Sequence, residues 1–62
     1  MNEQIVQQYE EIKVMVESLQ TDLIKNSQGN KSAGVRARKG LRELKKLVSN
    51  LVKSSLSSDK GD

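Results

Sequence analysis

The sequence Asn26-Ser27-Gln28-Gly29-Asn30 separates two apolar patterns that both have helical spacing. Gly29 suits the left-handed conformation that follows the end of a helix. Asn30 or Ser32 then suits the cap at the start of the next helix. The stretch therefore predicts a tight turn at about 28–31 between two helices.

Before the turn, apolar residues recur at alternating intervals of four and three, as they do along one side of a helix. This first stripe consists of Ile5, Tyr9, Ile12, Val16, Leu19 and Leu23, and it is widened by Val6, Met15 and Ile24. The pattern predicts a helix at about 3–27.

A second stripe follows the turn and predicts a helix at about 32–54. It consists of Ala37, Leu41, Leu44, Val48 and Leu51, with Leu47 and Val52 beside it. Gly34 and Gly40 lie inside this helix, where each costs about 1 kcal/mol relative to alanine. Either the helix tolerates this weakness, or its backbone closely approaches the first helix or a phosphate. Residues 57–62 lose the pattern, and we expect a disordered tail there.

The two patterns predict an all-α protein, folded as an antiparallel helical hairpin over residues 1–56. A lone hairpin leaves part of each stripe in water. The chain has neither cysteine nor histidine, which excludes disulfides and the usual zinc sites as sources of stability. Two hairpins packed as a four-helix bundle would bury the remaining apolar surface, so we expect a homodimer.

Charge is divided unequally along the chain. Residues 1–28 carry five acids and two bases, a net charge of −3, and residues 29–62 carry nine bases and three acids, a net charge of +6. The two halves together give the +3 of the whole chain. This asymmetry favours an anionic partner for the second half.

The bases concentrate in residues 31–46, which hold seven bases and one acid. Arg36 and Glu43 lie outside the main basic arc of the predicted helix. Like charges four residues apart destabilise a helix by a few tenths of a kcal/mol, so a helix needed only for solubility would mix the two signs. We interpret the arc as a polyanion site, with a merely solvated face as the alternative. At about 100° per residue, an arc of about 120° contains Lys31, Arg38, Lys39, Arg42, Lys45, Lys46 and Lys53.

Duplex DNA is the polyanion that the composition favours, because its phosphates require only exposed lysine and arginine. The candidates for reading bases are Arg36, Arg38 and Arg42, so we expect a weak sequence preference. The single aromatic residue, Tyr9, argues against stacking of single-stranded bases. RNA, held by its shape and phosphates, is one alternative partner. An acidic protein bound by a small coiled-coil module is the other.

Catalysis is not indicated. Histidine is absent, the acids are spread along helix surfaces, and the serines lack a partnering base. Gly29-Asn30-Lys31-Ser32 lacks the upstream glycine and the adjacent glycine and lysine of a phosphate-binding loop. We predict a non-enzymatic protein without cofactor or metal. A run of about 18 apolar residues and a secretory signal are also missing, so we expect a cytoplasmic protein without membrane association.

The pattern Gly29-Asn30-Lys31-x-Ala33-x-x-Arg36-x-Arg38 follows an acidic amphipathic helix and resembles the bacterial histone H1-like proteins of the chlamydial type, over roughly residues 5–56. The resemblance implies DNA binding, a place in the nucleoid and a role in chromosome condensation or regulation. The sequence departs from the chlamydial proteins at its C-terminus, because they continue into a long basic tail and this sequence stops at Asp62, so we expect a short form. By position, the family's basic motif matches Lys31, Arg36, Arg38 and Lys39. The predicted nucleic-acid-binding residues are Lys31, Arg36, Arg38, Lys39, Arg42, Lys45 and Lys46.

Overall fold

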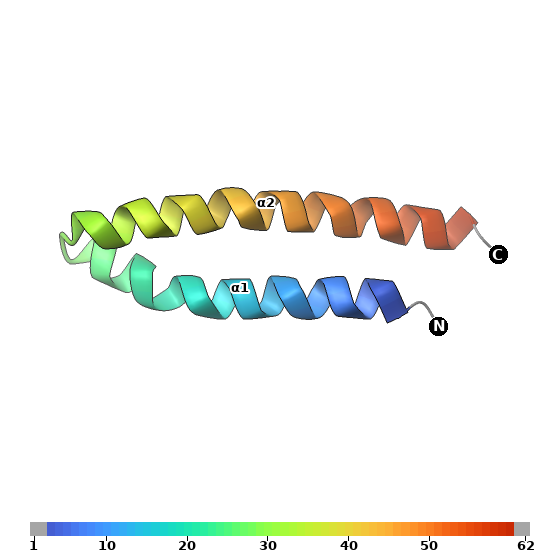
Figure 1. Ribbon diagram of the computed structural model, residues 1–62, viewed down its shortest axis with the longest axis horizontal. Helices are drawn as coiled ribbons and strands as arrows, with labels where there is room; N and C mark the ends of the chain where they lie inside the picture. Colours follow the sequence, from blue (N-terminus) through green and yellow to red (C-terminus); the bar gives the residue numbers. More distant parts are fainter. Residues whose placement is uncertain (1–2, 61–62) are drawn as a thin grey trace.

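The computed structural model describes residues 3–60 and shows two antiparallel helices joined by a short turn (Figure 1). α1 spans Glu3–Ser27 and α2 spans Lys31–Lys60. No strand occurs in the described range. The hairpin is slender, with extents of 50 × 15 × 11 Å, and α2 extends beyond the start of α1 at the end opposite the turn. The predicted all-α hairpin is thus confirmed.

Gly29 ends α1 in the left-handed region, with a φ of +97°. Its amide donates to the carbonyl of Asn26 at 3.0 Å, and the amide of Asn30 donates to the carbonyl of Lys25 at 3.1 Å. This pair of bonds is a Schellman motif, which satisfies carbonyls that the end of a helix leaves without partners. The role predicted for Gly29 is confirmed.

Asn30 caps α2 directly after the turn. Its side-chain Oδ1 accepts a hydrogen bond from the amide of Ala33 at 2.9 Å, which is the bond that an N-cap residue makes to the third residue of a helix. Its carbonyl accepts from the amide of Gly34 at 3.2 Å and from Nδ2 of Asn26 at 3.3 Å. Of the two predicted caps, Asn30 is used rather than Ser32. Because Asn30 takes part in both helix ends, the connection stays short.

α2 continues beyond the end predicted at about 54 and reaches Lys60. Residues 57–60 are therefore helical, although we expected a disordered tail there. Serine is only mildly unfavourable in a helix, and neither proline nor glycine interrupts the chain between Gly40 and Gly61. Extension of an existing helix costs far less than its nucleation. Residues 61–62 of the predicted tail lie outside the described residues.

Near the turn, the residues of α2 that are buried against α1 are small. Ala33 and Ala37 are buried, with 0% and 1% of their surface exposed, and Leu19 of α1 is 5% exposed. Gly40 lies against Leu19, because a Cβ added to this glycine would come within 2.5 Å of Cδ2 of Leu19. The absence of a side chain at Gly40 thus makes room for Leu19.

Gly34 allows a similar close approach one step nearer the turn. A Cβ added at Gly34 would collide with the side-chain amide of Asn26, which bonds to the carbonyl of Asn30. Of the two explanations for the helical glycines, the structure supports close packing against the first helix.

Farther from the turn, the inner surface is narrower than the predicted stripes. Each helix touches a single neighbour along one line, which cannot cover an apolar stripe wide enough for a bundle. Five residues assigned to the stripes are consequently 42–55% exposed, namely Tyr9, Val16, Leu23, Leu41 and Val48. The other stripe residues Ile5, Ile12, Leu44 and Leu51 are half-buried, as are Met15 and Leu47 beside the stripes. The polar residues Gln8, Asp22, Asn26, Ser54 and Ser58 are also half-buried.

We expect Gly40→Ala to lower the free energy of unfolding by about 1–2 kcal/mol, although alanine is the better helix former by up to about 1 kcal/mol. The added methyl would meet the buried side chain of Leu19. In a Leu19→Ala background, the same change should become stabilising, because the methyl then fills vacated space. Urea unfolding followed by circular dichroism measures the coupling between the two changes. The wild type, the two single variants and the double variant are compared at one protein concentration. Stabilisation by Gly40→Ala alone would contradict the close contact.

Candidate nucleic-acid interface

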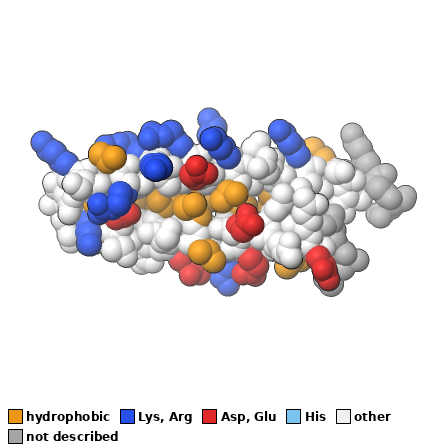
Figure 2. Space-filling view, viewed as in Figure 1, with side chains coloured by type: hydrophobic (Ala, Val, Ile, Leu, Met, Phe, Trp, Pro, Cys, Tyr) orange, Lys and Arg blue, Asp and Glu red, His pale blue; other side chains and the backbone are white. Residues whose placement is uncertain are grey.

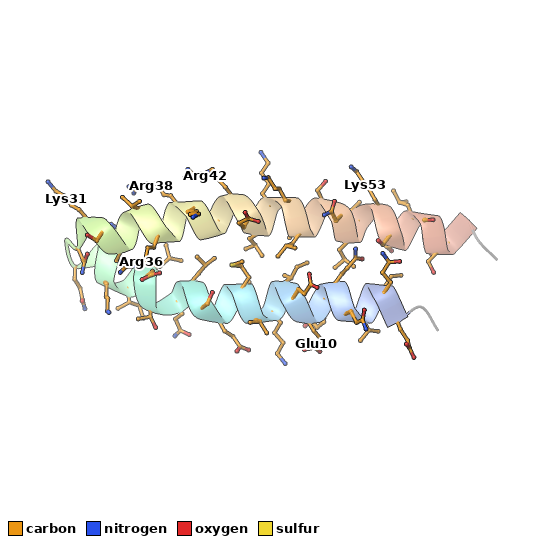
Figure 3. All side chains as sticks on the ribbon, in the orientation of Figure 1. Glu10, Lys31, Arg36, Arg38, Arg42 and Lys53 are labelled. Atoms are coloured by element: carbon orange, nitrogen blue, oxygen red, sulfur yellow. The ribbon has the colours of Figure 1, made fainter. Side chains whose placement is uncertain are left out.

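Seven exposed bases lie on the side of α2 that points away from α1. Figure 2 shows lysine and arginine side chains along the edge formed by α2. In Figure 3, the labelled side chains of Lys31, Arg38, Arg42 and Lys53 extend from this helix away from α1. We call this surface the basic face, and it consists of Lys31, Arg38, Lys39, Arg42, Lys45, Lys46 and Lys53.

The side chains of the basic face have no ion-pair or side-chain hydrogen-bond partner within residues 3–60. Arg38, Arg42 and Lys46 follow one another at intervals of four, so like charges are neighbours along the helix. No acidic group of the described chain offsets this repulsion through a direct contact. A polyanion would offset it from outside.

Ser49 and Asn50 add neutral hydrogen-bonding groups to the distal part of the basic face. They help to line a shallow hollow on α2, together with Arg42, Lys45, Lys46 and Lys53. Neither residue is among the predicted nucleic-acid-binding residues, because that prediction rests on charge alone. Helical spacing indicates them, because Ser49 lies four residues after Lys45 and Asn50 lies four residues after Lys46. Such side chains commonly bond to phosphate oxygens.

Arg36 is set apart from the basic face. Its Nε donates to Oδ1 of Asp22 on α1 at 3.2 Å, and Figure 3 shows it between the two helices. The two side chains are 55% and 23% exposed, so the ion pair is a surface contact near the turn. We predicted Arg36 as a nucleic-acid-binding residue, and the structure instead gives it an intramolecular partner. The partners are 14 residues apart, so no local pattern indicated the pair.

The two helices carry opposite net charges. α1 holds five acids and two bases, a net charge of −3, whereas α2 holds nine bases and two acids, a net charge of +7. In Figure 2, the edge formed by α1 carries acidic side chains, whereas the edge formed by α2 is lined by lysine and arginine. The field of the molecule therefore attracts a polyanion to α2 rather than to α1.

Residues 3–60 contain neither a membrane-spanning helix nor a cluster of metal ligands. Neither helix is long and apolar enough to cross a membrane. Over the same range, no three potential metal ligands among aspartate, glutamate, histidine and cysteine are grouped closely enough to hold an ion.

The family model of the histone H1-like protein Hc1 matches residues 6–61. The chain belongs to this family. The resemblance predicted from the basic motif is therefore confirmed, and the chain is a histone-like, DNA-binding protein of the nucleoid. Members of the Hc1 family are structural DNA-binding proteins rather than enzymes. Comparisons with curated proteins and with solved structures give no match.

The Hc1 match falls on the hairpin itself. It includes all of α2 and all of α1 except residues 3–5. The match therefore covers both helices, the turn and the basic face.

We expect Arg36→Ala to lower the free energy of unfolding by less than about 1 kcal/mol, as is usual for an exposed ion pair. The same change should weaken duplex binding less than Arg42→Ala does. Both variants lose one positive charge, so the comparison isolates position from net charge. Fluorescence anisotropy with a labelled duplex measures the two affinities. Equal losses would place Arg36 in the binding surface.

Proposed function

We propose that this Hc1-family protein binds duplex DNA through the basic face of α2, by contacts to phosphates that depend little on sequence. The observation that supports this most strongly is the row of seven exposed bases without partners in the described chain. Each phosphate neutralised by such a base releases condensed counterions, which drives association. Membership of the Hc1 family supports DNA as the polyanion.

The length of the basic face suits a duplex. Lys31 and Lys53 are 53 − 31 = 22 residues apart. At 1.5 Å per residue this is about 33 Å, close to one turn of B-form DNA. One hairpin would thus occupy about ten base pairs.

The residue types on the basic face support phosphate contact over base reading. Five of the seven residues of the basic face are lysines. A lysine acts as a flexible point charge, whereas the planar guanidinium of arginine can act as a bidentate donor. With Arg36 held by Asp22, Arg38 and Arg42 are the remaining arginines. Base discrimination needs several fixed donors in the groove, so we infer a weak sequence preference.

We also infer that the protein acts in the nucleoid as a homodimer. Among the described residues, the buried apolar core comprises Leu19, Ala33 and Ala37, whereas eleven large apolar side chains are exposed. Complete burial of a large apolar side chain contributes roughly 1.5–3 kcal/mol, so association of two hairpins into a four-helix bundle would add substantial stability.

The double change of Arg38 and Arg42 to alanine should weaken binding about equally for two unrelated duplexes. The slope of log affinity against log salt should fall by about one unit for each lost phosphate contact, hence by about two. The helix should remain folded, because both side chains are exposed and relief of their repulsion slightly favours it. A salt titration of binding, with wild type and variant side by side, gives the slopes.

The matched control is Lys13→Ala with Lys25→Ala, which removes the same charge from α1. Its slope should equal that of the wild type. Equal slopes for all three proteins would refute binding through the basic face. A loss that depends strongly on sequence would instead indicate base reading. Tighter binding to duplex RNA than to DNA, at matched salt, would change the assigned partner.

A further inference from the structure

One flank of the hairpin gathers exposed apolar side chains from both helices. At about 100° per residue, these side chains are displaced from the inner surface in the same rotational sense on both helices, which puts them on the same side of an antiparallel pair. A groove on this side is lined by Val16, Leu19, Leu23, Leu41 and Leu44, with Glu17 and Gln20. We call this surface the apolar flank, and it consists of Tyr9, Val16 and Leu23 of α1 and Leu41, Val48 and Val52 of α2, each 42–55% exposed.

A second copy of the chain is the occupant that fits the apolar flank. The flank runs from Tyr9 to Leu23 on α1 and from Leu41 to Val52 on α2, roughly 20 Å along the hairpin, so its cover must be an elongated apolar surface of matching shape. The same flank of another hairpin has this length and composition, and a two-fold axis makes such a surface self-complementary. The opposite side of the hairpin is less suited, because it carries the Arg36–Asp22 ion pair. A partner there would have to desolvate those charges.

Two symmetric arrangements bring two apolar flanks together. With the two-fold axis along the hairpin, each α2 lies over the α1 of the partner. With the axis across the hairpin, each helix lies over its own copy. The two basic faces point in opposite directions in the first arrangement and in the same direction in the second, because each basic face points away from the α1 of its own hairpin.

Charge favours the first arrangement. It places α2, with a net charge of +7, over the partner's α1, with a net charge of −3, whereas the second places two strongly basic helices together. Within the hairpin, Leu19 lies by Gly40 and Asp22 lies by Arg36. Two residues at the same height along the hairpin, one on each helix, therefore have residue numbers that add up to 58 or 59. Continued along the helices, this register puts Lys45 level with position 14, between Glu10 and Glu17. Glu17 lines the groove of this flank, so Lys45 would lie near Glu17 of the partner subunit.

We propose that two hairpins pair through the apolar flank with each α2 over the partner's α1, so that one dimer holds two separate duplexes on opposite edges of the bundle. This rests on the proposed binding of DNA by the basic face. Apart from Lys45 at the border of the interface, the residues of the basic faces stay outside it, and neither basic face can reach the duplex held by the other. The dimer therefore acts as a bridge between duplexes rather than as a longer site on one duplex.

Disulfide trapping tests the pairing without DNA. The sequence has no cysteine, so a single introduced thiol is unambiguous. Leu41 shares a level with position 18, close to Val16, and the first arrangement brings it near the partner's Val16. A refolded mixture of Val16→Cys and Leu41→Cys, made with different masses, should yield the mixed disulfide in excess. Predominant homodisulfides, or a wild-type protein that sediments as a monomer at micromolar concentration, would overturn the proposed pairing.

Capture of a second duplex tests the bridge. One duplex is fixed on beads, a labelled duplex is added in solution, and a gel shift on a single duplex is run in parallel. The wild-type protein should capture the labelled duplex. Val16→Glu should raise the dimer dissociation constant roughly a hundredfold. A two-fold interface contains the substitution twice, and each copy should weaken association about tenfold. This variant should still shift one duplex and should capture no second duplex.

Val14→Glu is the matched control, because it adds the same charge to α1 at a side chain that is 63% exposed and lies outside the apolar flank. It should bind and capture as the wild type does. Circular dichroism at the assay concentration shows whether Val16→Glu is helical, and the disulfide result decides the pairing if it is not. Capture by folded Val16→Glu at the wild-type level would refute the flank as the interface.

The failures of the bridge and of DNA binding are distinguishable. A wild-type protein that shifts one duplex but captures no second one overturns the bridge and leaves the proposed function intact. A wild-type protein that shifts no duplex overturns both, and the disulfide result then still decides how two hairpins pair.

Discussion

Leu19 packs where α2 has no side chain, because a Cβ at Gly40 would come within 2.5 Å of its terminal methyl. The short turn makes this contact possible. Gly29 takes the left-handed conformation and Asn30 caps the next helix, so α2 returns along α1 after only three non-helical residues. Ala33 and Ala37 keep the two backbones close over the same region. This local packing sets the relative position of the helices, and the exposed surfaces follow from it.

The narrow seam along which α1 and α2 meet determines what is exposed on the apolar flank and on the basic face. Since the helices meet along one line, the apolar residues beside that line stay exposed and form the apolar flank. The side of α2 opposite the seam is left to the bases, which have no described partner. One surface thus suits association with an apolar partner and the other suits a polyanion. Because they are different surfaces, the proposed self-association and the proposed DNA binding by the basic face would not compete.

The turn and the helix type could be predicted from the sequence, because Gly29, Asn30 and the apolar spacing act locally. The width of the contact between α1 and α2 could not be predicted from the sequence. An apolar stripe has the same spacing whether one neighbouring helix covers it or three. For the same reason, the sequence did not reveal that the polar residues Gln8 and Asp22 are half-buried. The placement of the basic face followed from helical periodicity. The partner of Arg36 required the register between the helices, which no local pattern contains.

Lysine footprinting tests the central claim, DNA binding by the basic face, most directly. The protein is acetylated briefly with and without a saturating duplex, and mass spectrometry gives the modification at each lysine. If DNA binds to the basic face, Lys31, Lys39, Lys45, Lys46 and Lys53 become protected, while Lys13 and Lys25 on α1 react as they do in the free protein. Protection of the α1 lysines equal to that of the α2 lysines, or no protection on α2, would contradict it.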